Sequence, residues 1–473
     1  MIPSWLIRST AVGFLLLLCL VSTGITETIV PGEAIVKFKV GGTPKSILNH
    51  PGITIADSIP DEQTYLLEFD TTRQVGGIIK MLLKNPHIQF AQPNHHYVLP
   101  EVQQISIGFP DQERPVFSFG TNPPTYYDQT GVYATGLDSA QVLASGAGVT
   151  VAVIDNGISF DHPLMQSSRV LGGHDFIDND NDPSEEPGTM YGHGTFVTGL
   201  ILLAAPDCQI VPIRAFDGDG VGSEFNTAKS IRKAIELGAQ VINMSFGTFE
   251  QYPVLASVVD RALSAGVVLV AASGNYGTTV PLYPAAFGSV ISVGAVDTQD
   301  QRALFSSYGP TLDLVAPGVN VYSSLAGEYE WGTWSGTSFS APFVTGTVAL
   351  VLERTGPLSS AAIQNHLRLT ARSTLLWGEL DVPDSYFGWG ALDAYAAVAD
   401  AAKGDLDNSG VVDATDLRIL SRLVFAGGQG HHGRPVSVRQ CDLNCNNGLD
   451  AGDVDRLAAY LFRGGPAPHR CTE

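Results

Sequence analysis

The run SGTSFSAPF, residues Ser335–Phe343, places four hydroxyl side chains within six positions and then reaches Pro342. Serine and threonine often cap the start of a helix, and proline is tolerated in the first helical turn. The run therefore predicts a helix that begins here with a hydroxyl cap. Because free N–H groups at a helix start can receive negative charge, one of these hydroxyls is also a candidate nucleophile.

Short apolar segments alternate with helical patterns upstream of this run. Strands are predicted over Val149–Asp155, Gln240–Phe246 and Val267–Ser273, and a helix is predicted over Thr227–Gly238. Continuous apolar strands that alternate with helices indicate an α/β fold, in which a parallel sheet carries helices on both faces. Functional residues of such folds gather at the carboxyl ends of strands, where Asp155 and Asn275 lie.

Four segments together offer the groups that serine-dependent peptide hydrolysis requires. These groups are a nucleophile, a base, a carboxylate that orients the base, and donors for the oxyanion. Asp155 lies in VAVIDNGI, His193 in YGHGTFVTG and Asn275 in VAASGNYG, and the run at Ser335–Phe343 supplies hydroxyls. Each residue alone is common in turns and loops, so the prediction depends on their combination.

These segments, in the order Asp, His, Ser, resemble the subtilisin-like serine proteases. The family motif Gly-Thr-Ser-x-x-x-Pro matches Gly336–Pro342, so the resemblance implies that Ser338 is the nucleophile. It likewise implies that Asp155 and His193 complete the triad. Asn275 and the backbone N–H of Ser338 are then the expected oxyanion donors.

The resemblance extends over about residues 126–402. NMSFG resembles the strand that pairs with the substrate backbone and forms a wall of the first specificity pocket, which makes Ser245, Phe246 and Gly247 the expected substrate-binding residues. FGWGALDAYAAV resembles the closing segment of the peptidase domain. One departure is Phe196, which stands where many members have a second histidine, and its expected role is structural.

The N-terminal part of the chain predicts a separate small domain. Strand composition over Glu33–Val40, Thr64–Asp70 and Ile88–Leu99, with a helical pattern over Val75–Lys84, indicates a compact α+β unit at residues 27–100. This unit resembles the inhibitory prodomain of the same proteases. Residues 101–125 are predicted to be a linker and processing region, and autocleavage is expected between about Tyr97 and Tyr126.

The first residues of the chain predict where the protein is located, and its net charge disfavours one class of partner. Residues 1–26 have a basic start at Arg8 and a short apolar core at Val12–Val21, which predicts a secretory signal. The alternative is a membrane anchor, which needs about 20 apolar residues, and this apolar core is shorter. The net charge of the 473-residue chain is −21, and no long basic run is present, so nucleic acid is a poor partner. In a secreted protein, the C-terminal cysteines predict one disulfide among Cys441, Cys445 and Cys471.

The tail, residues 404–473, contains a repeat with a constant offset of 37 residues. Asp405, Asp413 and Asp416 recur as Asp442, Asp450 and Asp453. Both copies fit a calcium loop with oxygen ligands at positions 1, 3, 5, 7 and 12. The predicted ligands are Asp405, Asp407, Ser409, Val411 and Asp416 in the first loop, and Asp442, Asn444, Asn446, Gly448 and Asp453 in the second.

Each loop precedes an amphipathic helix, predicted over Asp416–Phe425 and Asp453–Phe462. Two such units resemble a dockerin domain, which implies attachment to a cohesin module. The alternative is a calcium-stabilised cap without a partner. A further acidic cluster, Asp175–Glu186, is consistent either with another calcium site or with a solvated loop.

The sequence thus predicts a secreted serine endopeptidase that is made as a proenzyme, acts on proteins or peptides and binds two calcium ions in its tail. The first alternative is a catalytically silent, protease-like binding protein that its dockerin displays. A lipase or esterase is disfavoured, because Ser338 lies in no G-x-S-x-G elbow.

Overall fold

The computed structural model describes residues 28–47, 50–102, 116–118, 123–280, 282–327, 330–372, 374, 384–401, 417–418, 420–421, 424 and 450–463. The predicted signal segment, most of the linker and most of the tail lie outside the described residues. None of the helices that the structure describes combines the length and apolar character that a membrane span requires.

The N-terminal domain is an antiparallel sheet covered by one helix. Its strands follow the order β2-β3-β1-β4. They are β1 (Ile29–Phe38), β2 (Ile53–Ile59), β3 (Thr64–Phe69) and β4 (Ile88–Val98), with short 3-10 turns at Pro44–Ser46 and Pro60–Glu62. Ile78 and Leu82 of α1 (Val75–Leu82) pack into the core of this domain. The predicted strands and helix are confirmed, and β2 is an additional edge strand with a bulge between Ile55 and Asp57.

The large domain is built on a seven-stranded sheet with the order β13-β12-β11-β10-β6-β8-β7. All of its neighbouring strands run parallel. The strands are β6 (Thr150–Asp155), β7 (His174–Asp175), β8 (Gln209–Arg214), β10 (Val241–Met244), β11 (Val268–Ala272), β12 (Ile291–Val296) and β13 (Leu314–Pro317). Every residue of β10, β11 and β12 is buried, as expected for strands that are covered on both faces. The predicted parallel sheet is confirmed.

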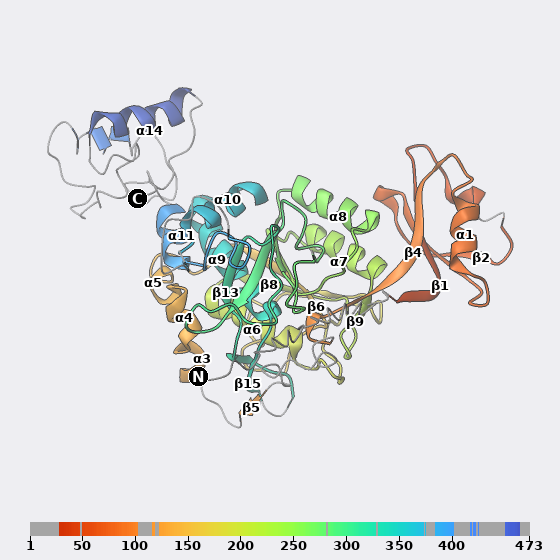
Figure 1. The fold of residues 1–473 in the computed structure, drawn as a ribbon, viewed down its shortest axis with the longest axis horizontal. Helices are drawn as coiled ribbons and strands as arrows, with labels where there is room; N and C mark the ends of the chain where they lie inside the picture. Colours follow the sequence, from red (N-terminus) through yellow and green to blue (C-terminus); the bar gives the residue numbers. More distant parts are fainter. Residues whose placement is uncertain are drawn as a thin grey trace, which may run out of the picture.

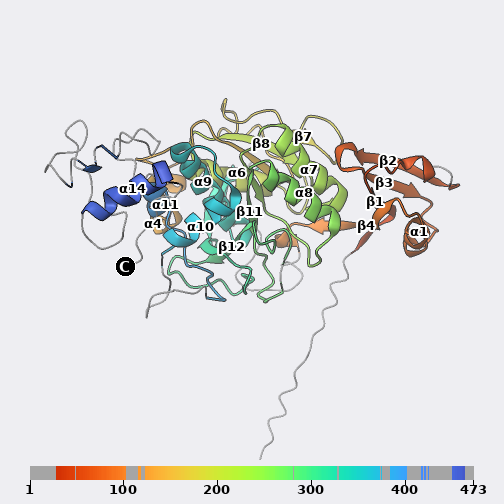
Figure 2. The ribbon, with the colours of Figure 1, turned by 90° about the horizontal axis from the view of Figure 1, so that it is seen from above.

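Helices cover this sheet in two groups that are visible in Figure 1 and, from above, in Figure 2. In one group α6 (His193–Ala204) contacts α9 (Thr337–Thr355), and α11 (Ala394–Ala401) contacts both α9 and α10 (Ser360–Thr370). In the other, α7 (Glu224–Glu236) contacts α8 (Pro253–Ser264). Short helices α3 (Pro123–Tyr127), α4 (Thr130–Ala134) and α5 (Leu137–Ala140) open the domain.

A small three-stranded sheet joins β14 (Val321–Ser324), β15 (Trp331–Trp334) and β5 (Val116–Ser118). β5 falls within the predicted linker, so part of that segment is built into the large domain. In the tail, α14 (Ala451–Arg463) confirms the predicted second helix.

Close packing fixes the spacing of α6 and α9, whose first residues include His193 and Thr337. A Cβ at Gly346 of α9 would lie 2.4 Å from the Cβ of Ala204 in α6, so a larger side chain there would push the helices apart. Glycine at this position lets the two helix starts lie side by side.

The N-terminal domain docks onto α7 and α8 through its sheet and its acidic side chains. β4 pairs with β9 (Val221–Ser223) of the large domain, so the N-terminal sheet continues into it. Asp57 pairs with Lys229, and Asp61 pairs with Arg232. The Asn94 side chain accepts a hydrogen bond from Phe225 N at 3.1 Å and so satisfies a free amide at the start of α7.

Candidate active site

Asp155 and His193 form a hydrogen-bonded pair in the interior of the large domain. Asp155 ends β6, and His193 begins α6. His193 Nδ1 lies 2.7 Å from Asp155 Oδ1, and both side chains are buried. The buried carboxylate fixes the ring orientation and leaves Nε2 facing the site.

Two further side chains hold the start of α6 in place, and the sequence analysis did not identify either. Asn156 accepts a hydrogen bond from Gly194 N at 2.9 Å and donates one to Met190 O at 2.8 Å. The carboxylate of Glu185 accepts hydrogen bonds from the backbone amides of Gly192 and Thr195. Burial raises the pKa of Glu185 to about 8, although these amides oppose that shift. Both residues keep the imidazole of His193 at a fixed position.

The side chain of Asn275 is held in one orientation by the first residue of α9. Its Oδ1 accepts hydrogen bonds from the backbone amide and the hydroxyl of Thr337, both at 2.8 Å. Its Nδ2 therefore points away from the helix, into the site. The N-cap position, Gly336, makes no side-chain cap, so the predicted hydroxyl cap is wrong. An amide oxygen from another segment serves instead.

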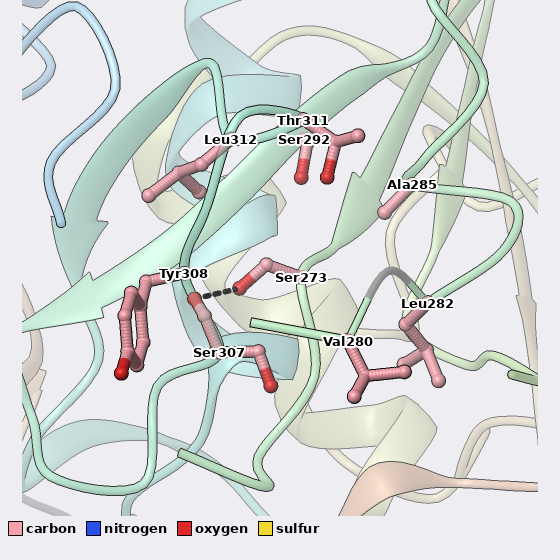
Figure 3. Close-up of a pocket in the computed structure, with 9 residues that line it drawn as sticks. All are labelled: Ser273, Val280, Leu282, Ala285, Ser292, Ser307, Tyr308, Thr311 and Leu312. Carbon is pink, nitrogen blue, oxygen red and sulfur yellow. Dashed lines mark hydrogen bonds between the residues drawn. The ribbon is translucent and has the colours of Figure 1, made fainter. Parts of the chain in front are cut away.

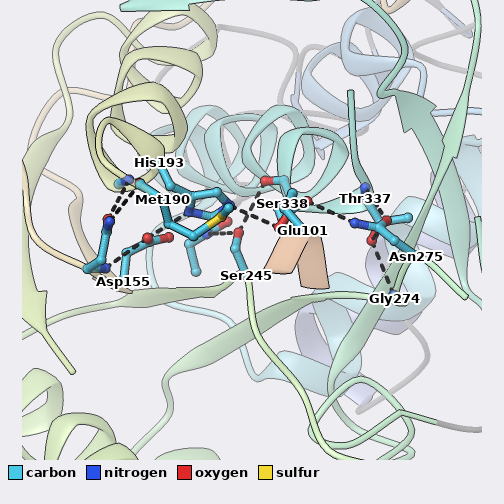
Figure 4. Close-up of polar contacts among 12 residues, drawn as sticks. Glu101, Asp155, Met190, His193, Ser245, Gly274, Asn275, Thr337 and Ser338 are labelled. Atoms are coloured by element: carbon cyan, nitrogen blue, oxygen red, sulfur yellow. Dashed lines mark hydrogen bonds and ion pairs between the residues drawn. The ribbon is translucent and has the colours of Figure 1, made fainter. Parts of the chain in front are cut away.

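Ser338 and His193 meet at one carboxylate, which Glu101 supplies from the segment just after β4. Glu101 Oε2 accepts a hydrogen bond from Ser338 Oγ at 3.0 Å and lies 3.1 Å from His193 Nε2. Its other oxygen, Oε1, accepts from Asn275 Nδ2 at 2.8 Å. Figure 4 shows these groups converging on Glu101. The carboxylate thus stands where a reacting carbonyl and its oxyanion would have to lie.

This arrangement changes the protonation of His193. Burial alone would lower its pKa, but the charges and hydrogen bonds of Asp155 and Glu101 raise the pKa to about 10. Apolar rings of Trp334 and Phe339 complete the surroundings of the imidazole. His193 is therefore an imidazolium at neutral pH while Glu101 is in place, and it cannot accept a proton.

The three predicted substrate-binding residues, Ser245–Gly247, make different contacts. Ser245 Oγ donates to the backbone oxygen of Ser338 at 3.1 Å, and the Phe246 ring packs on Phe216. Gly247 instead forms a β-bridge with Val98 of β4. On the opposite side Val98 pairs with Val221 of β9, so the end of β4 runs between two segments of the large domain.

The acidic cluster at Asp175–Glu186 already contains a cation from the protein. The buried guanidinium of Arg214 lies within 2.7 Å of carboxylate oxygens of Asp175, Asp178 and Glu186. These three carboxylates therefore hold a guanidinium rather than a metal ion. Asp178 and Glu186 are exposed, as the solvated-loop alternative expects. Among the described residues, no group of three or more Asp, Glu, His or Cys side chains could hold a metal ion.

In the tail, only Asp453 of the predicted calcium ligands belongs to the described residues. It is buried in the first turn of α14, and its carboxylate accepts a hydrogen bond from Asp450 N at 2.8 Å. The other nine predicted ligands lie outside that part of the chain, as do the C-terminal cysteines. Cys208 is free and buried, and burial raises its thiol pKa to about 12, so it is not a reactive nucleophile.

Comparisons with known proteins match both domains. The model of the subtilase family matches residues 146–390, and that of the fervidolysin N-terminal prodomain matches residues 21–94. Thermophilic serine proteinase from Bacillus sp. (strain AK1) is 33% identical over 388 residues, which are 78% of this chain and 88% of that protein. Subtilisin NAT from Bacillus subtilis subsp. natto is 32% identical over 341 residues, covering 69% and 85% of the two chains.

A solved structure supports the same fold. Fervidolysin from Fervidobacterium pennivorans, described as a keratinolytic enzyme related to subtilisin, aligns with a TM-score of 0.66. The alignment covers 78% of this chain and 61% of that one, at 23% sequence identity. At this identity the likeness bears on the fold alone.

Proposed function

The chain belongs to the subtilase family and is a subtilisin-like serine proteinase made with a prodomain, and from this premise we propose that Asp155, His193 and Ser338 are its catalytic triad. The observation that carries the proposal is the convergence of Ser338 Oγ, His193 Nε2 and Asn275 Nδ2 on one carboxylate. A nucleophile, a base and an oxyanion donor must surround a scissile carbonyl in the same way.

The reaction follows from these positions once Glu101 has left. His193 Nε2 takes the proton of Ser338 Oγ as that oxygen attacks the peptide carbonyl. Asp155 stabilises the imidazolium through the Nδ1 hydrogen bond, and Asn275, with the backbone N–H of Ser338, stabilises the oxyanion. His193 then protonates the leaving amine, and water hydrolyses the acyl-enzyme by the same steps.

Labelling with a fluorophosphonate tests the triad and separates the enzyme from a silent, protease-like binding protein. The protein recovered from the culture medium should react at Ser338, as located by mass spectrometry, and should hydrolyse a denatured protein substrate. A folded protein that neither reacts nor hydrolyses would support the silent alternative.

The N-terminal domain and the segment that follows it act as an inhibitor through the side chain of Glu101. This carboxylate contacts Ser338, His193 and Asn275, holds His193 as an imidazolium and excludes a peptide from the site. The Glu101 side chain, rather than a peptide carbonyl, accepts the hydrogen bond from Asn275 Nδ2. The described conformation is therefore a blocked one, and processing requires this segment to move.

We expect Glu101→Gln to increase the fluorophosphonate labelling rate of the full-length chain by about 10-fold to 100-fold. A hydrogen bond to a charged group contributes about 1.5–3 kcal/mol, and the substitution removes the charge that Ser338 and His193 contact. Glu68→Gln is the matched control, because Glu68 is exposed in the same domain. Equal labelling rates for the two variants would contradict the role of Glu101.

The increase in labelling rate that Glu101→Gln causes should become smaller as the pH rises. The pKa of His193 is raised from its ordinary value of 6.5 to about 10, so the stabilisation of the blocked state is complete below 6.5 and is lost as the pH rises through about 10. Asp155 and Glu101 are the charged groups that face the imidazole, and Glu185 lies next to Asp155. The ratio of the two labelling rates, Glu101→Gln over parent, should therefore fall between pH 7 and pH 10. A constant ratio would exclude the ion pair as the cause.

Residues 1–26 direct secretion, and the tail is a dockerin that binds a cohesin module and two calcium ions. The 37-residue repeat supports this assignment, and so does α14, which begins beside the buried Asp453. Subtilases commonly bind calcium, but the Arg214 cluster does not fit a further ion, because the guanidinium already pairs with its three carboxylates.

Removal of calcium should loosen α14. In the full-length chain, we expect a chelator to increase amide hydrogen exchange over residues 451–463 at least about tenfold, because loop carboxylates without a cation repel one another. Asp453→Ala should have the same effect in calcium, whereas Asp455→Ala, at an exposed position of α14, should not. Exchange that does not change with chelator would contradict the calcium assignment.

A further inference from the structure

The prodomain strand shows where a substrate side chain must go. Val98 bridges Gly247, Leu99 N donates to Gly220 O at 3.0 Å, and the Glu101 carboxylate reaches Asn275. A substrate that follows this path brings its scissile carbonyl to Asn275. The side chain just before the scissile bond then lies between Gly247 and Gly274, the residue preceding Asn275.

The space between these two glycines is already filled by Leu282. A Cβ added at Gly247 would lie 2.5 Å from Leu282 Cδ2, and one added at Gly274 would lie 2.7 Å from the same methyl group. The Leu282 side chain is 3% exposed. One methyl group therefore contacts both walls and closes the slot between them.

The backbone keeps Leu282 in this place. Tyr283, the next residue, exchanges two hydrogen bonds with Thr248, at 2.7 and 2.8 Å, and Thr248 follows Gly247 directly. Leu282 O also accepts a hydrogen bond from Ala286 N at 2.8 Å. Leu282 is thus attached to one wall of the slot through the residue that follows it, and its backbone cannot move aside without breaking this pairing.

A small cavity lies behind Leu282. Its volume is about 10 Å³, and its lining includes Ser273, Leu282, Ala285 and Ser307, as Figure 3 shows. Such a space holds about one water molecule, whereas a cavity that accepts an aromatic ring has about 150 Å³. This cavity therefore has no room for a large side chain.

We propose that Leu282 determines the cleavage specificity by restricting the residue before the scissile bond to glycine, alanine or serine. The inference rests on the proposed function, since it concerns substrates of the same site. It defines the substrate class as proteins whose extended segments are rich in small residues. A bulky residue at this position would have to displace the buried Leu282 side chain.

The test compares peptides that differ only in the residue before the scissile bond. For the secreted enzyme we expect kcat/KM for alanine to exceed that for phenylalanine by about 10²-fold or more, since steric exclusion of a large group is decisive in a closed pocket. Leu282→Ala joins the slot to the cavity and should reverse this preference or remove it. Leu282→Val should give an intermediate ratio of kcat/KM for alanine to that for phenylalanine. This variant replaces Leu282→Ala in the test if the alanine variant does not fold.

Leu312→Ala is the matched control, because Leu312 lines the same cavity without touching Gly247 or Gly274. It should leave the alanine-to-phenylalanine ratio within about threefold of the parent. Preferred cleavage after phenylalanine by the parent would overturn the proposal, and so would a ratio that neither Leu282 variant changes. Absence of both cleavage and fluorophosphonate labelling would instead refute the proposed function, so the two failures are distinguishable.

Discussion

Replacing Ser338 by alanine should reduce kcat by about 10⁶-fold, the effect expected when a serine protease loses its nucleophile. Ser338 Oγ is the hydroxyl that shares a carboxylate oxygen with His193 Nε2. Without it, the imidazole has no oxygen to activate at the position that Asn275 faces. The measurement is hydrolysis of a peptide substrate by the purified variant, with its circular dichroism spectrum and Tm compared with those of the parent.

Ser340→Ala provides the matched control, because it makes the same change two residues later in α9. Ser340 Oγ is buried and has no hydrogen-bond partner among the described residues, so its loss should change kcat by less than about threefold. The Ser338→Ala chain should also keep its N-terminal domain covalently attached, if processing is intramolecular. A folded Ser338→Ala variant with near-parental activity would disprove the assignment.

Replacing Asp155 by asparagine should reduce kcat by about 10⁴-fold. The Asp155 carboxylate accepts hydrogen bonds from His193 Nδ1 at 2.7 Å and from Asn156 N at 2.8 Å. An amide of nearly the same shape can present its NH₂ group to Nδ1, which favours the tautomer with a protonated Nε2. That tautomer cannot take the proton of Ser338.

The pKa of His193 gives a second readout for this variant. Because the Asp155 charge is a principal cause of the raised pKa, Asp155→Asn should lower the pKa of His193, as NMR of the imidazole would detect. Asp161→Asn, at an exposed position of the following loop, should change neither kcat nor this pKa. A variant that loses stability but keeps both its kcat and its imidazole pKa would show that Asp155 is only structural.

The sequence predicted the parallel sheet well because its signal is local. Wholly apolar segments such as Val267–Ser273 correspond to strands buried on both faces, and each appears within one or two residues of its predicted bounds. The four expected catalytic positions also lie together in the structure. They stand at strand ends and helix starts, which short motifs identify directly.

Groups that depend on distant contacts escaped sequence analysis. Glu101 is 237 positions from Ser338, and no motif near Glu101 marks it as a partner of the active site. Arg214 follows the acidic cluster by 28 residues or more, so the cluster alone was consistent with either a calcium site or a solvated loop. The filling of the specificity pocket by Leu282 depends on side-chain packing, which periodicity and composition do not encode.

The pairing of β4 with β9 has a consequence for the protein after processing. While the prodomain is bound, one edge of β9 pairs with His96, Tyr97 and Val98. When the prodomain leaves, this edge of β9 is exposed. Exposed strand edges promote association between copies of a chain. The same edge can add an extended substrate as a new strand. Substrate capture and self-association therefore compete for one set of backbone groups, and the prodomain protects the newly made enzyme from the second.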